Sequence, residues 1–80
     1  MAKPSPSFSG NSTLTAIGKA IRAERVRRGM AQEALAFEAG IDRSYLGGIE
    51  RGEHNVAIIN LAKIAKALSI NLSELLKEVA

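Results

Sequence analysis

The chain has 80 residues, the size of one small domain, and a chain this short buries too little surface to enclose a large active-site cavity. It contains no cysteine, which excludes disulfide bonds and thiolate metal sites and suits the reducing environment of the cytoplasm. The formal net charge is a mild +3, and no run of about 18 apolar residues or signal-peptide pattern predicts a membrane span or export.

The first twelve residues, MAKPSPSFSGNS, are rich in proline, serine and glycine. Such a composition cannot bury enough apolar surface to offset the entropy lost on ordering, so residues 1–12 are predicted to form a flexible tail. Apolar residues at helical spacing follow the tail: Leu14, Ile17 and Ile21. They predict a first helix over residues 14–28, with Ser12 or Thr13 as its cap and Gly29 as its end.

Basic residues crowd this first predicted helix. Five of them fall within ten residues that contain one acid, Glu24: Lys19, Arg22, Arg25, Arg27 and Arg28. A cluster of positive charges indicates a polyanionic partner such as nucleic acid. A solvated helix face accounts equally well for these charges, so the cluster alone does not decide between the two interpretations.

Two short helices joined by a glycine turn are predicted next. The first covers residues 32–39 and ends at Gly40, because glycine tolerates the left-handed conformation of a tight turn. Asp42 can cap the second, over residues 43–51, and Gly52 ends it. The residues of this segment that are expected to face the core are apolar: Leu35, Ala36, Ala39, Ile41, Leu46 and Ile49.

Two further helices are predicted from apolar stripes. The fourth helix carries its stripe at these positions: Ile58, Leu61, Ile64, Ala65 and Leu68. The stripe of the fifth helix is shorter: Leu72, Leu75, Leu76 and Val79. Asn71 and Glu74 form an asparagine variant of the capping box before it. Because no segment alternates with period two, we expect an all-α, compact five-helix fold.

The two helices around Gly40 have the size of a helix-turn-helix. Within QEALAFEAGIDRSYLGGIERG, the small Ala36 stands where two helices must approach closely. Together with IRAERVRRGMAQEALA and LAKIAKALSINLSELL, this segment resembles the Cro/repressor-type (XRE-like) helix-turn-helix family. The resemblance implies a lambda-repressor-like domain over residues 13–80, with its helix-turn-helix at 32–51, that binds double-stranded DNA as a transcription regulator.

The resemblance also implies that the third helix enters the DNA major groove. With its apolar residues turned inward, the opposite face of this helix is expected to present five residues: Arg43, Ser44, Gly47, Gly48 and Arg51. Arg43 is expected to read a base, since its guanidinium matches the two acceptors of guanine. Ser44 can donate to a base edge or a phosphate, and Arg51 is expected to meet the phosphate backbone.

The adjacent glycines 47 and 48 are unusual, because each costs about 1 kcal/mol relative to alanine inside a helix. Without side chains there, the helix can lie closer to the groove floor, to a thymine methyl or to the helix that it crosses. DNA shape would then carry a sizeable part of the sequence preference. The competing interpretation is that one glycine serves helix packing and the other is incidental.

Other residues of this region are candidate DNA contacts. Gln32 matches a family position that meets a phosphate oxygen. Ala31 stands where the family usually has a capping serine or threonine, so the second helix should start weakly. Tyr45 can pack at the rim of the core or reach a phosphate or sugar. His54 and Asn55 resemble family positions that touch the DNA backbone, with an ordinary surface loop as the alternative.

A buried ion pair is expected between Arg25 and Glu50. One further turn along the stripe of the first helix leads to Arg25, and one further turn along the third helix leads to Glu50. The resemblance implies the same pairing, and removing one partner of such a pair typically costs about 3 to 5 kcal/mol.

The last two helices carry more apolar side chain than a five-helix core should need. The resemblance implies a two-fold homodimer whose reading helices lie about 34 Å apart on a near-palindromic operator. Its expected interface consists of four residues: Ile59, Leu72, Leu76 and Val79. A larger core is the alternative. RNA polymerase is a further candidate partner, and no cofactor or metal is expected.

Within this family, DRSYLGGIERG looks like the controller proteins of restriction-modification systems. A phage repressor, a Cro-like switch and an antitoxin are alternatives, and a protein-binding module on the same fold is an alternative of another class. Catalysis is not expected, since the acids are scattered over helix surfaces and do not converge with a histidine in a cleft.

Overall fold

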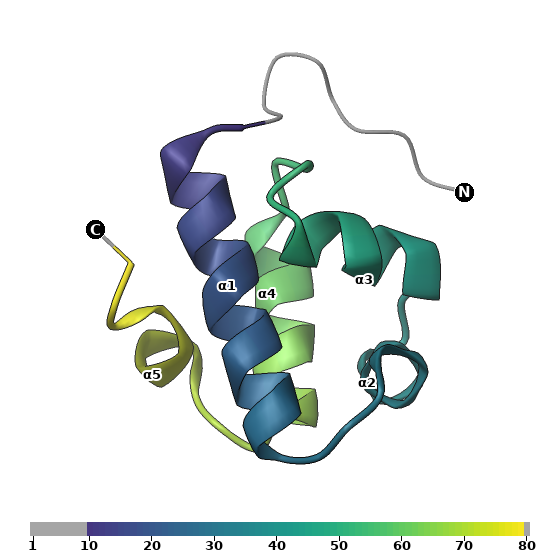
Figure 1. Ribbon diagram of the computed structural model, residues 1–80. Helices are drawn as coiled ribbons and strands as arrows, with labels where there is room; N and C mark the ends of the chain where they lie inside the picture. The colour runs from purple at the N-terminus through teal and green to yellow at the C-terminus, as the bar shows by residue number, and fades with distance from the viewer. Residues whose placement is uncertain (1–9, 80) are drawn as a thin grey trace.

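The structure is a computed structural model, and it describes residues 10–79. Its elements are five helices, α1 (Ser12–Arg27), α2 (Gln32–Ala39), α3 (Arg43–Glu50), α4 (Ile58–Ala67) and α5 (Leu72–Leu76), shown in Figure 1. The predicted all-α, five-helix fold is confirmed. None of the helices within residues 10–79 is long and apolar enough to cross a membrane. Most of the predicted tail, residues 1–9, lies outside the described residues.

The cap of α1 is Asn11, so the prediction of Ser12 or Thr13 was wrong. The Asn11 side-chain oxygen accepts hydrogen bonds from the backbone N–H groups of Thr13 at 3.0 Å and Leu14 at 3.2 Å. These are the second and third N–H groups of the helix, which otherwise have no partner within it. Asparagine caps as well as serine, and here it stands one residue earlier, so α1 begins within the predicted tail.

Asp42 and Asn71 cap α3 and α5 as predicted. An Asp42 carboxylate oxygen accepts from the N–H groups of Ser44 at 3.0 Å and Tyr45 at 3.3 Å. The Asn71 side chain accepts from the N–H of Glu74 at 2.7 Å, although the reciprocal bond of a capping box is absent within residues 10–79. Gly40 has the left-handed φ of +70° that ends α2.

The apolar faces of the helices meet in one core. α1 packs against α3 and α5, while α2 packs against α3 and α4; in Figure 1, α5 and the α2–α3 pair lie on opposite sides of α1. The largest fully buried side chains come from α1, α2, α3 and α4 and from the residue that follows α4: Ile21, Leu35, Leu46, Ile49, Ile64 and Leu68. The prediction for Ile58 was wrong, since this first residue of α4 is 64% exposed. Val56, in the preceding loop, is buried instead.

Two glycines, Gly18 in α1 and Gly52 in the loop between α3 and α4, let the end of α3 lie directly on α1. A Cβ on Gly18 would lie 2.5 Å from the carbonyl oxygens of both Ile49 and Glu50. A Cβ on Gly52 would lie 2.8 Å from the Cα of Thr15. Any larger residue would push α3 outward, so this close approach fixes the position of α3 relative to the core.

Candidate nucleic-acid interface

The structure brings Arg25 and Glu50 together beneath α3. The Arg25 Nε lies 2.8 Å from one carboxylate oxygen of Glu50, and Nη2 donates to the other at 3.1 Å. The remaining Nη1 donates to the backbone oxygen of Met30 at 2.8 Å. The two side chains are only 12% and 2% exposed. The ion pair therefore ties the end of α1 to the end of α3 in the interior.

Gln32, the expected phosphate ligand, is bonded to this ion pair. Its side-chain Nε2 donates to Glu50 Oε1 at 3.1 Å, and its Oε1 accepts from Arg43 Nη1 at 3.4 Å. The amide therefore already has partners in the protein. The first backbone N–H groups of α2 are available as donors, because Ala31 has no side chain that could cap them. This absence of a cap agrees with the expected weak start of α2.

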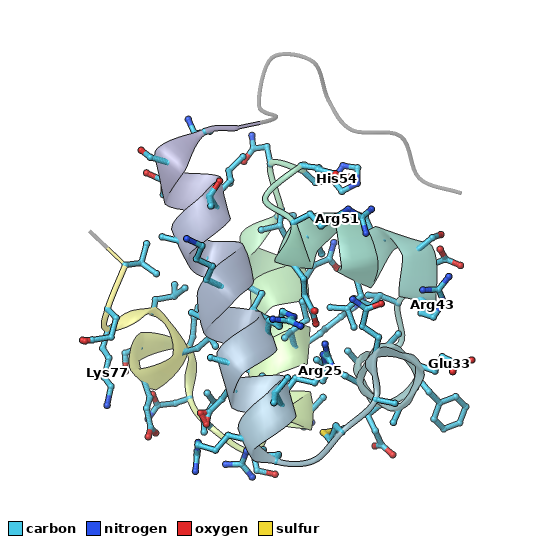
Figure 2. All side chains as sticks on the ribbon, viewed as in Figure 1. Arg25, Glu33, Arg43, Arg51, His54 and Lys77 are labelled. Carbon is cyan, nitrogen blue, oxygen red and sulfur yellow. The ribbon has the colours of Figure 1, made fainter. Side chains whose placement is uncertain are left out.

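Arg43 is exposed at the N-terminal end of α3, whereas Leu46 and Ile49, further along the same helix, are buried. Figure 2 shows Arg43 at one end of α3, with Arg51 and His54 near the other end. Apart from the long contact with Gln32, no hydrogen bond to a described residue occupies its guanidinium. Arg43 is thus free to meet an external acceptor.

Ser44 is partly buried and its hydroxyl donates to the Asp42 carboxylate. This hydrogen bond is the main cause, and the bond from the backbone N–H of Tyr45 the second, that holds the pKa of Asp42 below its usual value. The only proton of the Ser44 hydroxyl is therefore engaged in the cap of α3. The expected donation from Ser44 to DNA would require this bond to break, whereas its oxygen can still accept.

Arg51 and Glu53 form an exposed pair at the end of α3. Arg51 Nε lies 2.9 Å from Glu53 Oε2, and Nη2 donates to Oε1 at 3.1 Å. The hydrogen bonds from this guanidinium lower the pKa of the Glu53 carboxyl. Because an exposed pair is only weakly held, a phosphate can replace Glu53 as the partner of Arg51.

Gly47 and Gly48 are buried, so the expectation of a bare surface in the middle of α3 was wrong. A Cβ on Gly48 would lie 2.5 Å from the Cδ2 and Nε2 atoms of His54. A Cβ on Gly47 would lie 3.2 Å from Arg51 Nη1 and 3.5 Å from Gln32 Oε1. Side chains from α2, the end of α3 and the following loop cover the two positions.

Tyr45 packs at the rim of the core, which is one of the two expected placements. Its ring centroid lies 5.3 Å from that of His54, at an interplanar angle of 47°. Its hydroxyl oxygen accepts from Asn60 Nδ2 on α4 at 3.2 Å. The role of Asn60 was not predicted, since a single asparagine among the polar residues of α4 gives no signal of its own. Asn55, next to His54, is exposed.

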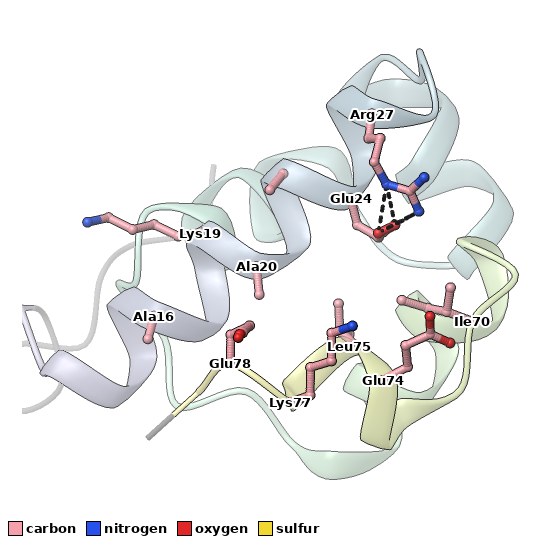
Figure 3. Close-up of a pocket in the computed structure, with 11 residues that line it drawn as sticks. Ala16, Lys19, Ala20, Glu24, Arg27, Ile70, Glu74, Leu75, Lys77 and Glu78 are labelled. Atoms are coloured by element: carbon pink, nitrogen blue, oxygen red, sulfur yellow. Dashed lines mark hydrogen bonds and ion pairs between the residues drawn. The ribbon is translucent and has the colours of Figure 1, made fainter.

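A groove of about 470 Å³ lies between α1 and α5, away from these residues (Figure 3). Its walls combine alanines of α1 with Ile70 and Leu75, and its carboxylates come from three glutamates: Glu24, Glu74 and Glu78. Glu24 is paired with Arg27, as the dashed lines in Figure 3 show. Within residues 10–79, no three or more His, Cys, Asp or Glu side chains gather to hold a metal ion.

A model of the Helix-turn-helix family (HTH_3) matches residues 21–75. The chain belongs to the helix-turn-helix family. It is a DNA-binding transcriptional regulator and not an enzyme, and α2 and α3 lie within the matched residues.

This helix-turn-helix protein is similar to several controller proteins. It is 43% identical over 60 residues to Control protein C.BamHI from Bacillus amyloliquefaciens, covering 74% of each chain. It is similar to the restriction-modification controller protein C.AhdI from Aeromonas hydrophila, with 48% identity and a TM-score of 0.76, covering 78% of this chain and 94% of that chain. C.Esp1396I bound to a 25 base pair operator site gives 33% identity and a TM-score of 0.77, covering 84% and 88%.

The basic cluster of the helix-turn-helix protein is divided between the interior and the surface. Arg25 is largely enclosed beside Glu50, and Arg27 pairs with Glu24, whose pKa is lowered by that hydrogen bond. The other three members are exposed: Lys19, Arg22 and Arg28. Only part of the cluster is thus available to a polyanion.

The four residues expected in the dimer interface differ in exposure. Ile59 is 62% exposed at the start of α4. Leu72, Leu76 and Val79 are half-buried and pack against the core. These three residues therefore contribute to the larger core that was the alternative, while part of each side chain stays accessible.

Proposed function

We propose that this helix-turn-helix protein is a controller protein of a restriction-modification system that binds a near-palindromic operator as a homodimer. The likeness to C.BamHI and C.AhdI, which extends over most of each chain, supports this subtype. The likeness to C.Esp1396I bound to an operator supports the DNA-binding mode.

The exposure of Arg43 on α3 is the observation that best supports the proposed recognition of DNA. Arg43 stands exposed at the start of α3, while Leu46 and Ile49 fix the helix to the core with their buried side chains. The guanidinium can therefore reach the major groove and bind the two acceptors of a guanine. The uncapped first turn of α2 lies beside it and offers N–H groups to a phosphate.

The remaining candidate residues would surround this contact. Gln32 would meet a phosphate by exchanging one of its present partners, and Arg51 would do so by leaving Glu53. The others would form the neighbouring surface along α3 and its loop: Ser44, Tyr45, Gly47, Gly48, His54 and Asn55. The two glycines would meet DNA only where the side chains that cover them move aside.

The proposed homodimer uses the exposed apolar start of α4 and the accessible edges of α5. Ile59 would lie in the interface with Leu72, Leu76 and Val79 around it. A two-fold dimer would set two α3 helices about 34 Å apart, one turn of DNA. In the cytoplasm, RNA polymerase would be the further partner of a regulator placed at such a site.

Selection of binding sites from random duplex DNA tests this function. We expect enrichment of two related half-sites, and an affinity that falls steeply with rising salt as phosphates release their counterions. If no duplex were enriched, and none bound at low salt, DNA reading would be refuted and the protein-binding module on this fold would take its place.

A further inference from the structure

The loop after α3 folds back along the helix. Gly52 has a φ of +76°, and its N–H donates to the oxygen of Ile49 at 3.0 Å. The N–H of Glu53 donates to the oxygen of Gly48 at 2.9 Å. These two bonds form a Schellman motif, which reverses the chain at the end of a helix. His54, the next residue, is thereby directed back over α3.

The imidazole of His54 occupies the space that Gly48 leaves empty. A Cβ on Gly48 would lie 2.5 Å from two of its ring atoms, closer than non-bonded carbon atoms approach. Its Nε2 is buried and has no hydrogen-bond partner among the described residues. Packing, and not a hydrogen bond from this nitrogen, therefore holds the ring in place.

The same ring supports Tyr45. The two ring centroids are 5.3 Å apart, and Tyr45 lies one helical turn before Gly48 on the same side of α3. The hydroxyl of Tyr45 is in turn bonded to Asn60 of α4. His54 thus fills the gap beside Tyr45 and holds that ring between the loop and α4.

We propose that His54 is a positioning residue for DNA reading, and that residue 48 is glycine because the imidazole needs its Cβ space. This inference rests on the proposed function. From the loop, the His54 ring fills the space beside Gly48, where α3 has no side chain. It thereby fixes the orientation of Tyr45 next to the DNA-facing residues. It acts through this packing and not by a hydrogen bond from its enclosed Nε2.

Gly47→Ala is the matched control for Gly48→Ala. Both substitutions add one methyl group to the same helix and bring the same gain in helix propensity. The nearest atoms to a Cβ on Gly47 are the ends of two flexible side chains, Arg51 and Gln32, which can move. The difference in thermal stability between the two variants therefore reports the conflict with His54.

The experiment compares four full-length variants with the wild type: Gly47→Ala, Gly48→Ala, His54→Ala and the double variant Gly48→Ala/His54→Ala. Circular dichroism and thermal unfolding monitor the fold, and fluorescence anisotropy measures the affinity for the selected operator and for a scrambled duplex. Gly48→Ala should weaken operator binding about tenfold relative to the wild type, as expected when groups in contact are energetically coupled.

The double variant should recover the thermal stability lost in Gly48→Ala, because an alanine methyl fits the space that the imidazole vacates, and it should bind the operator like His54→Ala. His54→Ala should lower the ratio of operator to scrambled affinity, since Tyr45 loses its support. If Gly48→Ala does not fold while the control and the double variant do, the pairing is supported, and operator binding by His54→Ala and the double variant decides the positioning role.

Additive effects of the two substitutions on unfolding would overturn the pairing. Coupled unfolding with an unchanged ratio of operator to scrambled affinity would overturn the positioning role. A wild-type protein that binds no duplex would refute the proposed function itself, and the positioning role with it, whereas the unfolding data would still decide the pairing of Gly48 with His54.

Discussion

Gln32 donates a hydrogen bond to Glu50 across 3.1 Å, so the first residue of α2 is joined to the buried ion pair that holds α1 to α3. The same amide accepts a long bond from the exposed Arg43. A residue at the proposed DNA surface is thus connected through one side chain to the interior, which links the position of the reading helix to the stability of the fold.

Glu50→Ala should destabilise the protein strongly. It leaves the buried guanidinium of Arg25 without its charge partner, and a loss of about 3 to 5 kcal/mol in the free energy of unfolding is expected. Chemical denaturation measures this loss. Glu53→Ala is the control, because it removes a carboxylate from an exposed pair and should leave the denaturation midpoint almost unchanged. Similar midpoints for both variants would contradict a structural role of the buried pair.

Arg43→Ala should relax one position of the operator. Loss of a bidentate contact with guanine should reduce affinity for the selected site by about 1 to 3 kcal/mol, with little loss on sequences that lack that base. Gln32→Ala should instead weaken binding to all sequences alike, as expected for a phosphate contact. Anisotropy titrations against a panel of single-base operator variants measure both. Equal losses on every sequence for Arg43→Ala would assign this residue to the backbone.

Stability should fall at low pH through Asp42. Its pKa is lowered in the folded protein, chiefly by the Ser44 hydroxyl and then by the N–H of Tyr45. A depressed pKa stabilises the fold above the unfolded value of about 3.9, and this contribution is lost as the pH falls through the lower folded value. Thermal unfolding of wild type and Asp42→Asn across this range tests it. Asparagine still caps but does not titrate, so the variant should show a smaller decline; identical declines would exclude Asp42 as a source.

Ile59→Glu should weaken the proposed dimer without unfolding the chain, because Ile59 is 62% exposed. A buried carboxylate without a partner is strongly unfavourable in an apolar interface. Sedimentation equilibrium measures the association. Phe37→Glu, a change of the same kind at a residue of α2 that is 84% exposed, is the control and should leave association unchanged. If both variants associate like the wild type, the interface lies elsewhere.

Local signals allowed much of the fold to be predicted. Asp42, Asn71 and Gly40 act on backbone groups within a few residues of themselves, so their roles follow from residue type and spacing. Asn11 was missed because neighbouring polar residues compete for the same cap. Ile58 was misplaced because helical spacing continues into a first turn that extends beyond the core.

The covering of Gly48 could not be predicted from helical spacing. It depends on the turn at Gly52, which directs His54 back over α3, and on the size of the imidazole relative to the empty Cβ position. The bond between Gln32 and Glu50 likewise joins α2 to α3, two helices whose relative position follows from how each packs in the core. Such contacts arise from the packing of elements that are distant in the sequence.

Titration of the isotope-labelled protein with the selected operator, followed by the backbone amide resonances, tests most directly whether the start of α2 and the outer side of α3 meet DNA. The largest shifts are predicted at Gln32, Arg43 and Ser44, with the amides of α5 changed least. Shifts confined to α5, or none at these three residues under conditions where the operator is bound, would contradict the account.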